Sequence, residues 1–193
     1  METTINIFWF RRDLRLDDNV GFYNALKSEH KVLPIFIFDE EILSKLPKDD
    51  ARVTFIFDTL QEMRNELQEK YGSSIAMLKG KPIEVFKQLM VDYTIDTVFT
   101  NRDYEPYAKE RDAKIATLLS KENINFKTFK DHVIFEKDEV VKSDGDPYKV
   151  YTPYMKLWKK EFEKIDLKIY YTNQFLDNLI ENSRLPNVSL ADI

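Results

Sequence analysis

The strongest constraint on the fold of this chain is a regular alternation of short apolar runs with segments of helical length. The apolar runs predict strands at residues 5–10, 31–38, 74–79, 97–100 and 125–130. Between them, residues 51–71 are the clearest helix, because their apolar residues recur every three or four positions. Most successive strands start roughly 25 to 30 residues apart, as in a βαβ unit. The pattern predicts an α/β fold: a doubly wound, Rossmann-like, five-stranded parallel sheet in the order 3-2-1-4-5, with helices on both faces.

The composition limits the class of protein. At 193 residues and 43% hydrophobic content, the chain can build one sizeable core. It contains no cysteine, which excludes disulfides and thiol chemistry and fits a reducing compartment. The formal charge of −5 argues against binding nucleic acid through a broadly basic face. With no signal peptide or membrane-length apolar run, we expect a cytoplasmic monomer with no membrane partner.

Two clusters of polar residues follow predicted strands. Arg11, Arg12 and Asp13 come directly after the first strand, and residues 101–105 follow the fourth. In open α/β sheets, ligands bind outside the carboxyl ends of the strands, where the strand order reverses. We therefore expect the two clusters to face each other across a crevice. The alternative is a solvated loop whose charges pair with one another.

Several common site types are absent from the sequence. Its four glycines form neither a dinucleotide-binding G-x-G-x-x-G nor a P-loop. His30 and His132 are far apart and lack the spacing of metal ligands, so we predict no metal site. No Ser/His/Asp arrangement is recognisable either.

Four stretches of the sequence resemble one family. Residues 8–19, FWFRRDLRLDDN, resemble the N-terminal signature of the DNA photolyase and cryptochrome family. Residues 101–107, NRDYEPY, the pair Asp131 and His132, and residues 147–154, PYKVYTPY, resemble later family segments in the same order. The resemblance is greatest to class I cyclobutane pyrimidine dimer photolyases.

The resemblance implies a two-part protein. Family members have an N-terminal α/β domain that can hold a light-harvesting antenna pigment, and a larger helical domain that holds flavin adenine dinucleotide (FAD) and damaged DNA. By this comparison, residues 1–131 form the antenna-type domain, residues 132–164 an exit segment and helix, and residues 165–193 the start of the interdomain linker; the helical domain is absent. The full-length protein is expected to repair cyclobutane pyrimidine dimers by light-driven electron transfer from reduced flavin. The fragment alone is expected to be inactive and to hold no catalytic residue.

The resemblance also points to candidates for binding an antenna pigment. They are Arg11, Phe36, Phe38, Asp39, Arg52, Asp103 and Glu105. The arginines would pair with anionic groups, the carboxylates would accept hydrogen bonds, and one phenylalanine would stack on the pigment ring. Each has a structural alternative: Arg52 pairs with Asp49 or a nearby carboxylate, and both phenylalanines belong to the sheet core.

Pigment identity and function each leave alternatives open. Folate-binding members carry an Asn-Glu pair where this sequence has Tyr107 and Ala108, so a deazaflavin or a flavin is favoured. A cryptochrome light receptor is the nearest alternative, because the repair function is decided in the helical domain. A stand-alone nucleotide-binding or interaction module is the third, and a reading frame that ends near Ile193 would favour it.

Overall fold

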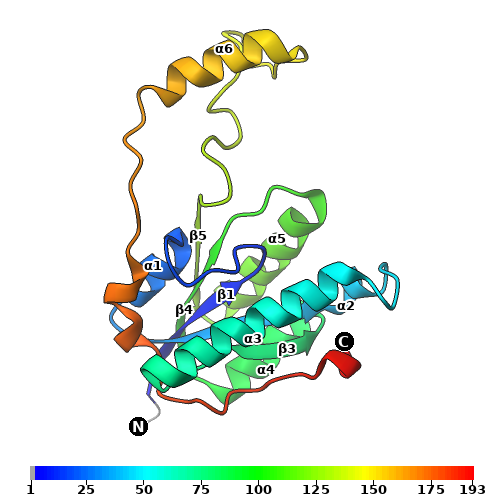
Figure 1. The fold of residues 1–193 in the computed structure, drawn as a ribbon, viewed down its shortest axis with the longest axis vertical. Coiled ribbons are helices and arrows are strands. Elements are labelled where there is room, and N and C mark those ends of the chain that lie inside the picture. Colours follow the sequence, from blue (N-terminus) through cyan, green and yellow to red (C-terminus); the bar gives the residue numbers. More distant parts are fainter. Residues whose placement is uncertain (1–2) are drawn as a thin grey trace.

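A five-stranded parallel sheet forms the centre of the molecule (Figure 1). The computed structural model describes residues 3–193. The strands are β1 (Ile5–Phe10), β2 (Lys31–Asp39), β3 (Ala76–Gly80), β4 (Ile95–Asn101) and β5 (Asn125–Phe129). Their order is β3-β2-β1-β4-β5, with every pair parallel. The predicted fold class and strand order are confirmed.

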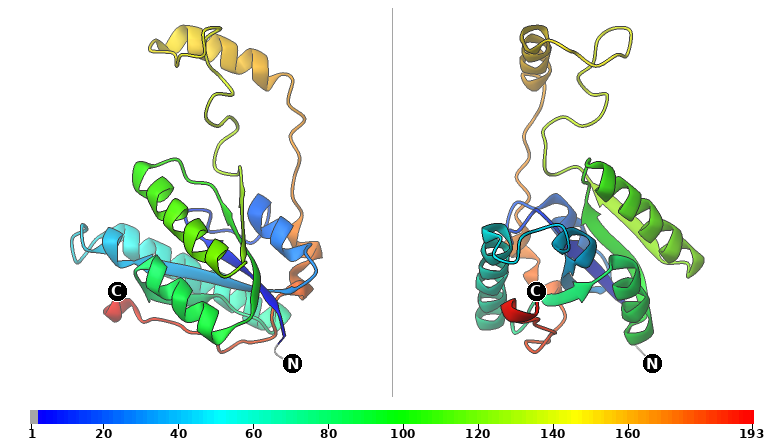
Figure 2. Two further views of the ribbon diagram at one scale, coloured as in Figure 1. Left: turned by 180° about the vertical axis from the view of Figure 1, so that it is seen from behind. Right: turned by 90° about the vertical axis from the view of Figure 1, so that its right-hand side faces the viewer.

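Helices cover both faces of the sheet (Figure 2). They are α1 (Val20–Leu26), α2 (Glu40–Leu43), α3 (Ala51–Tyr71), α4 (Pro82–Asp92), α5 (Pro106–Lys121) and α6 (Tyr151–Phe162). Helices α1 and α3 pack on one face, and α4 and α5 on the other, so there are two apolar cores. Strand β1 supplies both: Phe8 and Phe10 lie in the first core, while Ile7 and Trp9 lie in the second. This is why its sequence is continuously apolar.

Local sequence signals fix the helix ends. Asn19 caps α1 by accepting a hydrogen bond from the amide of Phe22, at 3.1 Å. Helix α3 spans the predicted residues 51–71 and ends at Gly72, whose φ of 60° is the left-handed conformation typical of a helix C-terminus. Helix α2 was not predicted, since it has only four residues; it begins directly after Asp39, which caps it.

The end of the chain packs back onto the sheet. Residues 172–193 contain the short 3-10 helices η1 (Thr172–Gln174), η2 (Leu176–Asn178) and η3 (Leu190–Asp192). The amide of Met77 in β3 donates to the carbonyl of Pro186 at 2.8 Å, so this tail covers the outer edge of the sheet. Arg64 of α3 is buried. It donates hydrogen bonds to the carbonyl of Ile75, just before β3, and to the carbonyls of Leu185 and Pro186 in the tail. The segment expected to begin an interdomain linker is thus joined to the α/β core from Tyr170 onward.

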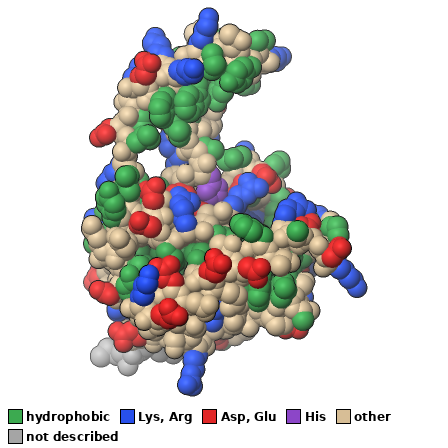
Figure 3. All heavy atoms as spheres, in the orientation of Figure 1, with side chains coloured by type: hydrophobic (Ala, Val, Ile, Leu, Met, Phe, Trp, Pro, Cys, Tyr) green, Lys and Arg blue, Asp and Glu red, His purple; other side chains and the backbone are tan. Residues whose placement is uncertain are grey.

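Helix α6 stands away from the rest of the molecule (Figures 1 and 2). We call residues 133–169, which carry it, the α6 lobe. None of the residues of α6 is buried. The lobe is held by aromatic contacts of its own, such as Trp158 with Phe135 and Phe162 at ring-centroid distances of 5.5 and 5.0 Å. Figure 3 shows hydrophobic side chains gathered on its surface. Across residues 3–193, no helix combines the length and hydropathy needed to span a membrane.

Candidate functional site

A cavity of about 570 Å³ opens at the carboxyl ends of β1 and β2. Its walls are α2 and the loop after it, the first turns of α3, and the loop from β4 into α5. All seven predicted pigment-binding residues line it: Arg11, Phe36, Phe38, Asp39, Arg52, Asp103 and Glu105. The structure therefore brings together residues from three strand ends and one helix start. Whether they bind a pigment stays a prediction.

The two charged loops after β1 and β4 meet, and residues of both line the cavity. The buried carboxylate of Asp13 accepts a hydrogen bond from the side-chain amide of Asn101, across the point where the strand order reverses. Arg12 bridges the same loops, with 2.8 Å to Glu105 and 3.7 Å to Asp103. Hydrogen bonds and ion pairs thus join the two loops, and the cavity extends from them over the ends of β1 and β2.

The Arg11 side chain is held by other residues of the protein where it borders the cavity. It is buried, with its guanidinium group 2.8 Å from the carboxylate of Asp112 in α5. It also donates to the carbonyl of Asn101 and lies over the ring of Trp9, 5.1 Å from the centroid. Burial lowers the pKa of Arg11, partly offset by Asp112. Arg11 therefore holds α5 against β1, so the wall of the cavity depends on it.

Arg52 pairs with the residue that caps its own helix. Its guanidinium group lies 2.6 Å from Asp50, and the Asp50 carboxylate also accepts from the Arg52 amide. The hydrogen bonds from Arg52 lower the pKa of Asp50 to about 2. The pairing is with Asp50 and not Asp49, but it is the structural alternative that the sequence left open. The Arg52 side chain remains 73% exposed at the rim of the cavity.

Phe36 and Phe38 lie in the floor of the cavity. Their rings contact each other edge to face, at 4.8 Å between centroids. Both belong to the core beneath α3, with exposed fractions of 7% and 3%. They are therefore core residues that also line the cavity.

Three residues outside the predicted set of seven also shape this cavity. The hydroxyl of Tyr107 donates to Asp39 at 2.5 Å and thereby joins α5 to the end of β2. Arg111 lies over the rings of Trp9 and Tyr107, at 4.8 and 5.7 Å from their centroids. Lys45 lies over the Tyr107 ring, at 5.5 Å. Burial and the hydrogen bond to Asp39 raise the pKa of Tyr107, so its hydroxyl stays a donor.

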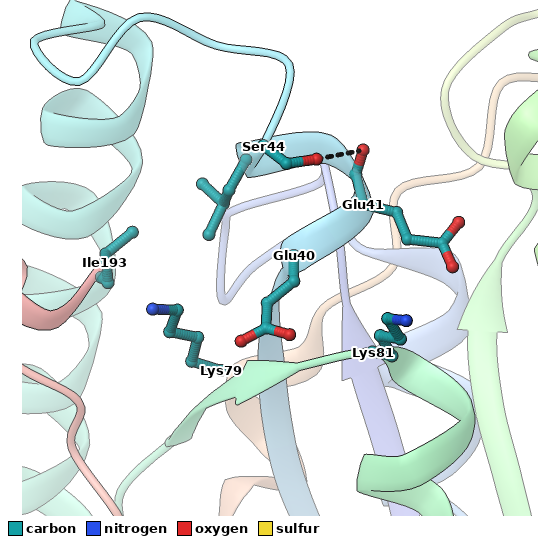
Figure 4. Close-up of a pocket in the computed structure, with 7 residues that line it drawn as sticks. Glu40, Glu41, Ser44, Lys79, Lys81 and Ile193 are labelled. Atoms are coloured by element: carbon teal, nitrogen blue, oxygen red, sulfur yellow. Dashed lines mark hydrogen bonds between the residues drawn. The ribbon is translucent and has the colours of Figure 1, made fainter.

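A second hollow lies beside the C-terminal residue. It has a volume of about 580 Å³ and is lined by Glu40, Leu43, Lys79, Lys81 and neighbouring residues. Figure 4 shows the Glu40 side chain extending between Lys79 and Lys81. No aromatic side chain lines it. It offers charge but no surface on which a flat ring can stack.

Asp13, Asp131 and His132 form a compact polar group. One nitrogen or oxygen atom of each lies within 4.8 Å of the others. Asp131 already accepts from Arg15 at 2.8 Å and from the amide of Val20 at 3.0 Å. Among the residues that the structure describes, neither ring nitrogen of His132 has a hydrogen-bond partner, and both are buried. The group joins the exit of β5 to the loop after β1.

Comparisons with known proteins agree with this architecture. The family model described as DNA photolyase matches residues 6–170. The deoxyribodipyrimidine photo-lyase of Synechococcus sp. is 33% identical over 155 residues, which cover 80% of this chain and 32% of the relative. This chain thus spans about a third of that protein's length.

Solved structures of photolyases have the same fold. A bacterial class III photolyase from Agrobacterium tumefaciens superposes with a TM-score of 0.79 at 23% identity, covering all of this chain and 38% of that one. An archaeal photolyase from Sulfolobus tokodaii, with a TM-score of 0.71 and 26% identity, covers 94% of this chain and 43% of its own. That archaeal protein is described with two FAD molecules and the implication of a novel light-harvesting cofactor. With the family model matching most of its length and this sheet order, the chain belongs to the DNA photolyase family.

Proposed function

We propose that this chain is the light-harvesting domain of a deoxyribodipyrimidine photolyase and that its cavity binds an antenna pigment. The observation that carries the proposal is the cavity at the carboxyl ends of β1 and β2, which all seven candidate residues line. A rigid pocket suits this role, because energy transfer requires a fixed distance and orientation between donor and acceptor. The surrounding strand ends and helix starts are rigid elements of that kind.

The chemistry of the cavity fits a flat heteroaromatic ring. Its volume of about 570 Å³ lies within the range of small-molecule sites. Phe36 and Phe38 offer an aromatic floor, and Asp39 offers a buried acceptor. We favour a flavin or a deazaflavin over a folate. The Sulfolobus photolyase, described with a second FAD, supports this choice by analogy.

We propose that repair itself needs more than these residues. Residues 1–131 would be the antenna-type domain, residues 132–164 the exit segment and helix, and residues 165–193 the start of the linker to a helical domain. That helical domain would hold the FAD that donates the electron and would contact the damaged DNA. The length of the Synechococcus relative, about three times the matched region, supports this division. We expect no repair of pyrimidine dimers by residues 1–193 alone.

The test is a binding titration of the purified chain with flavin mononucleotide, a deazaflavin and a reduced folate. Absorption and fluorescence spectra would follow the pigment. We expect saturable binding of a flavin or deazaflavin, weakened about tenfold by Asp39→Asn, which removes a charged acceptor. Asp58→Asn, on the exposed side of α3, is the matched control and should change nothing. Failure of all three pigments to bind would refute the proposal.

A further inference from the structure

We propose that the cavity selects a flat heteroaromatic ligand with an anionic tail, such as a flavin phosphate, and that Lys45 binds the anionic group. The inference rests on the proposed function, because it concerns the ligand of the same cavity. It goes further by naming the anionic tail as the part of the ligand that raises affinity and Lys45 as the residue that binds this tail.

Lys45 differs from the other cations of the cavity in having no ion pair. Arg11, Arg12, Lys45, Arg52 and Arg111 line the cavity. Each arginine has a carboxylate partner, at 2.8, 2.8, 2.6 and 3.1 Å respectively. Lys45 forms no ion pair with any residue in the range 3–193, and its ammonium group lies over the ring of Tyr107. Its charge is therefore the one that a ligand can neutralise without breaking an existing pair.

Asp39 differs from the other acids of the cavity in the same way. Asp103 and Glu105 both pair with Arg12. Asp39 has no cationic partner within residues 3–193; it accepts only from the Tyr107 hydroxyl and the Glu41 amide. A carboxylate has about four acceptor positions, so Asp39 can accept a further N–H. It is 5% exposed, which places this acceptor in the interior of the cavity.

Tyr107 fixes the acceptor and the cation relative to each other. Its hydroxyl holds Asp39 at 2.5 Å, and its ring lies 5.5 Å below the Lys45 ammonium group. The cavity thus offers a buried acceptor and an exposed cation that both contact Tyr107. A flavin phosphate carries a complementary group for each: its ring has an imide N–H, and its ribityl chain ends in a phosphate. A neutral riboflavin supplies only the first of these groups.

The experiment compares flavin mononucleotide with riboflavin, which share one ring and differ by the phosphate. Fluorescence titrations of residues 1–193 would give both dissociation constants. We expect flavin mononucleotide to bind about fivefold more tightly, the effect of one partly exposed ion pair. The preference should shrink as salt is raised. Lys45→Gln should abolish it without changing riboflavin binding, and Lys45→Arg should keep most of it.

Lys48→Gln is the matched control, because Lys48 is exposed in the same loop but does not line the cavity. It should leave the preference unchanged. Equal affinity for the two flavins, or a preference that survives Lys45→Gln, would overturn this inference while leaving the antenna function standing. Binding of neither flavin would also overturn it, and the absence of binding by any pigment would refute the proposed function as well.

Discussion

Arg11 illustrates how a residue can border a cavity and yet act on the protein itself. Its guanidinium group is buried against Asp112, so Arg11→Ala removes one partner of a buried ion pair. Because Arg111 still pairs with Asp112, we expect a loss of about 3 kcal/mol in the free energy of unfolding, the lower end for such a change. Urea denaturation followed by circular dichroism measures it. Arg12→Ala, which breaks half-exposed pairs, should cost less than about 1 kcal/mol; equal losses would contradict this view.

Tyr107 gives a prediction about pH. Its pKa lies above the ordinary 10.0, so the folded state holds the phenol proton more tightly than the unfolded state. The contribution to stability is complete below about pH 10 and is lost as the pH rises toward the folded pKa. Tyr107→Phe should therefore destabilise the protein at neutral pH by about 1 kcal/mol, because Asp39 loses a donor.

The test is to measure the free energy of unfolding of wild type and of Tyr107→Phe at several pH values. Between neutral pH and about pH 10 the difference between wild type and Tyr107→Phe should be constant, and above that it should narrow. Tyr104→Phe is the control for removing a hydroxyl from an exposed tyrosine. A difference that widens at high pH would show that the Tyr107 pKa is not raised.

The site residues were predictable to the extent that they follow strand ends. Asp39, Asp103 and Glu105 could be placed at the cavity because a parallel sheet puts all its strand ends on one edge. Tyr107 and Arg111 gave no such signal, because they reach the cavity from one face of α5, and the rotation of a helix about its axis is set by packing. The direction of the Arg11 side chain was equally unpredictable, since its partner Asp112 is 101 residues away.

At the scale of elements, the tail covers the edge strand β3 and adds to the core. Leu185 is buried in the core shared with α4 and α5, and its carbonyl accepts from Arg64. We expect Leu185→Ala to lower the free energy of unfolding by about 3 kcal/mol, as for other buried leucines. The control is Leu190→Ala, which is 39% exposed and should change stability by less than about 0.5 kcal/mol. Similar small losses for both would mean that the tail adds nothing to the core.

The strands and helices themselves were largely predictable from the hydrophobic pattern. In a sheet buried on both faces the strands are continuous apolar runs, and the helices between them show an apolar residue every three or four positions. The bounds of β1 and α3 match the residues that the pattern indicated. Strand β3 starts two residues later than predicted, since Ser74 lies outside the hydrogen-bonded segment, and β4 starts two residues earlier. The covering of β3 by the tail had no local signal, as it depends on contacts more than 100 residues apart.

At the scale of the whole molecule, the α6 lobe should be the least stable part. Helix α6 buries none of its residues, whereas α3 buries Leu60, Met63 and Leu67. We therefore expect the amides of α6 to exchange with deuterium at nearly the rate of an unstructured peptide, and those of α3 to exchange only on global unfolding. Hydrogen exchange with mass spectrometry tests this. Equal protection of the two helices would contradict it.

The path of the chain into and out of the α6 lobe has a consequence for how this architecture can vary. The chain leaves the sheet at Asp131, which is paired with Arg15, and returns at Tyr170, whose amide donates to Asp18. The two ends of the α6 lobe are thus both bonded to the turn after β1. The α/β unit is therefore built from two separate stretches of sequence, one before the lobe and one after it. An insertion or deletion between Asp131 and Tyr170 should change the lobe without disturbing strand pairing, because the turn fixes both ends of the lobe. The α6 lobe can therefore change in length while the turn after β1 holds both of its ends and the cavity keeps its shape.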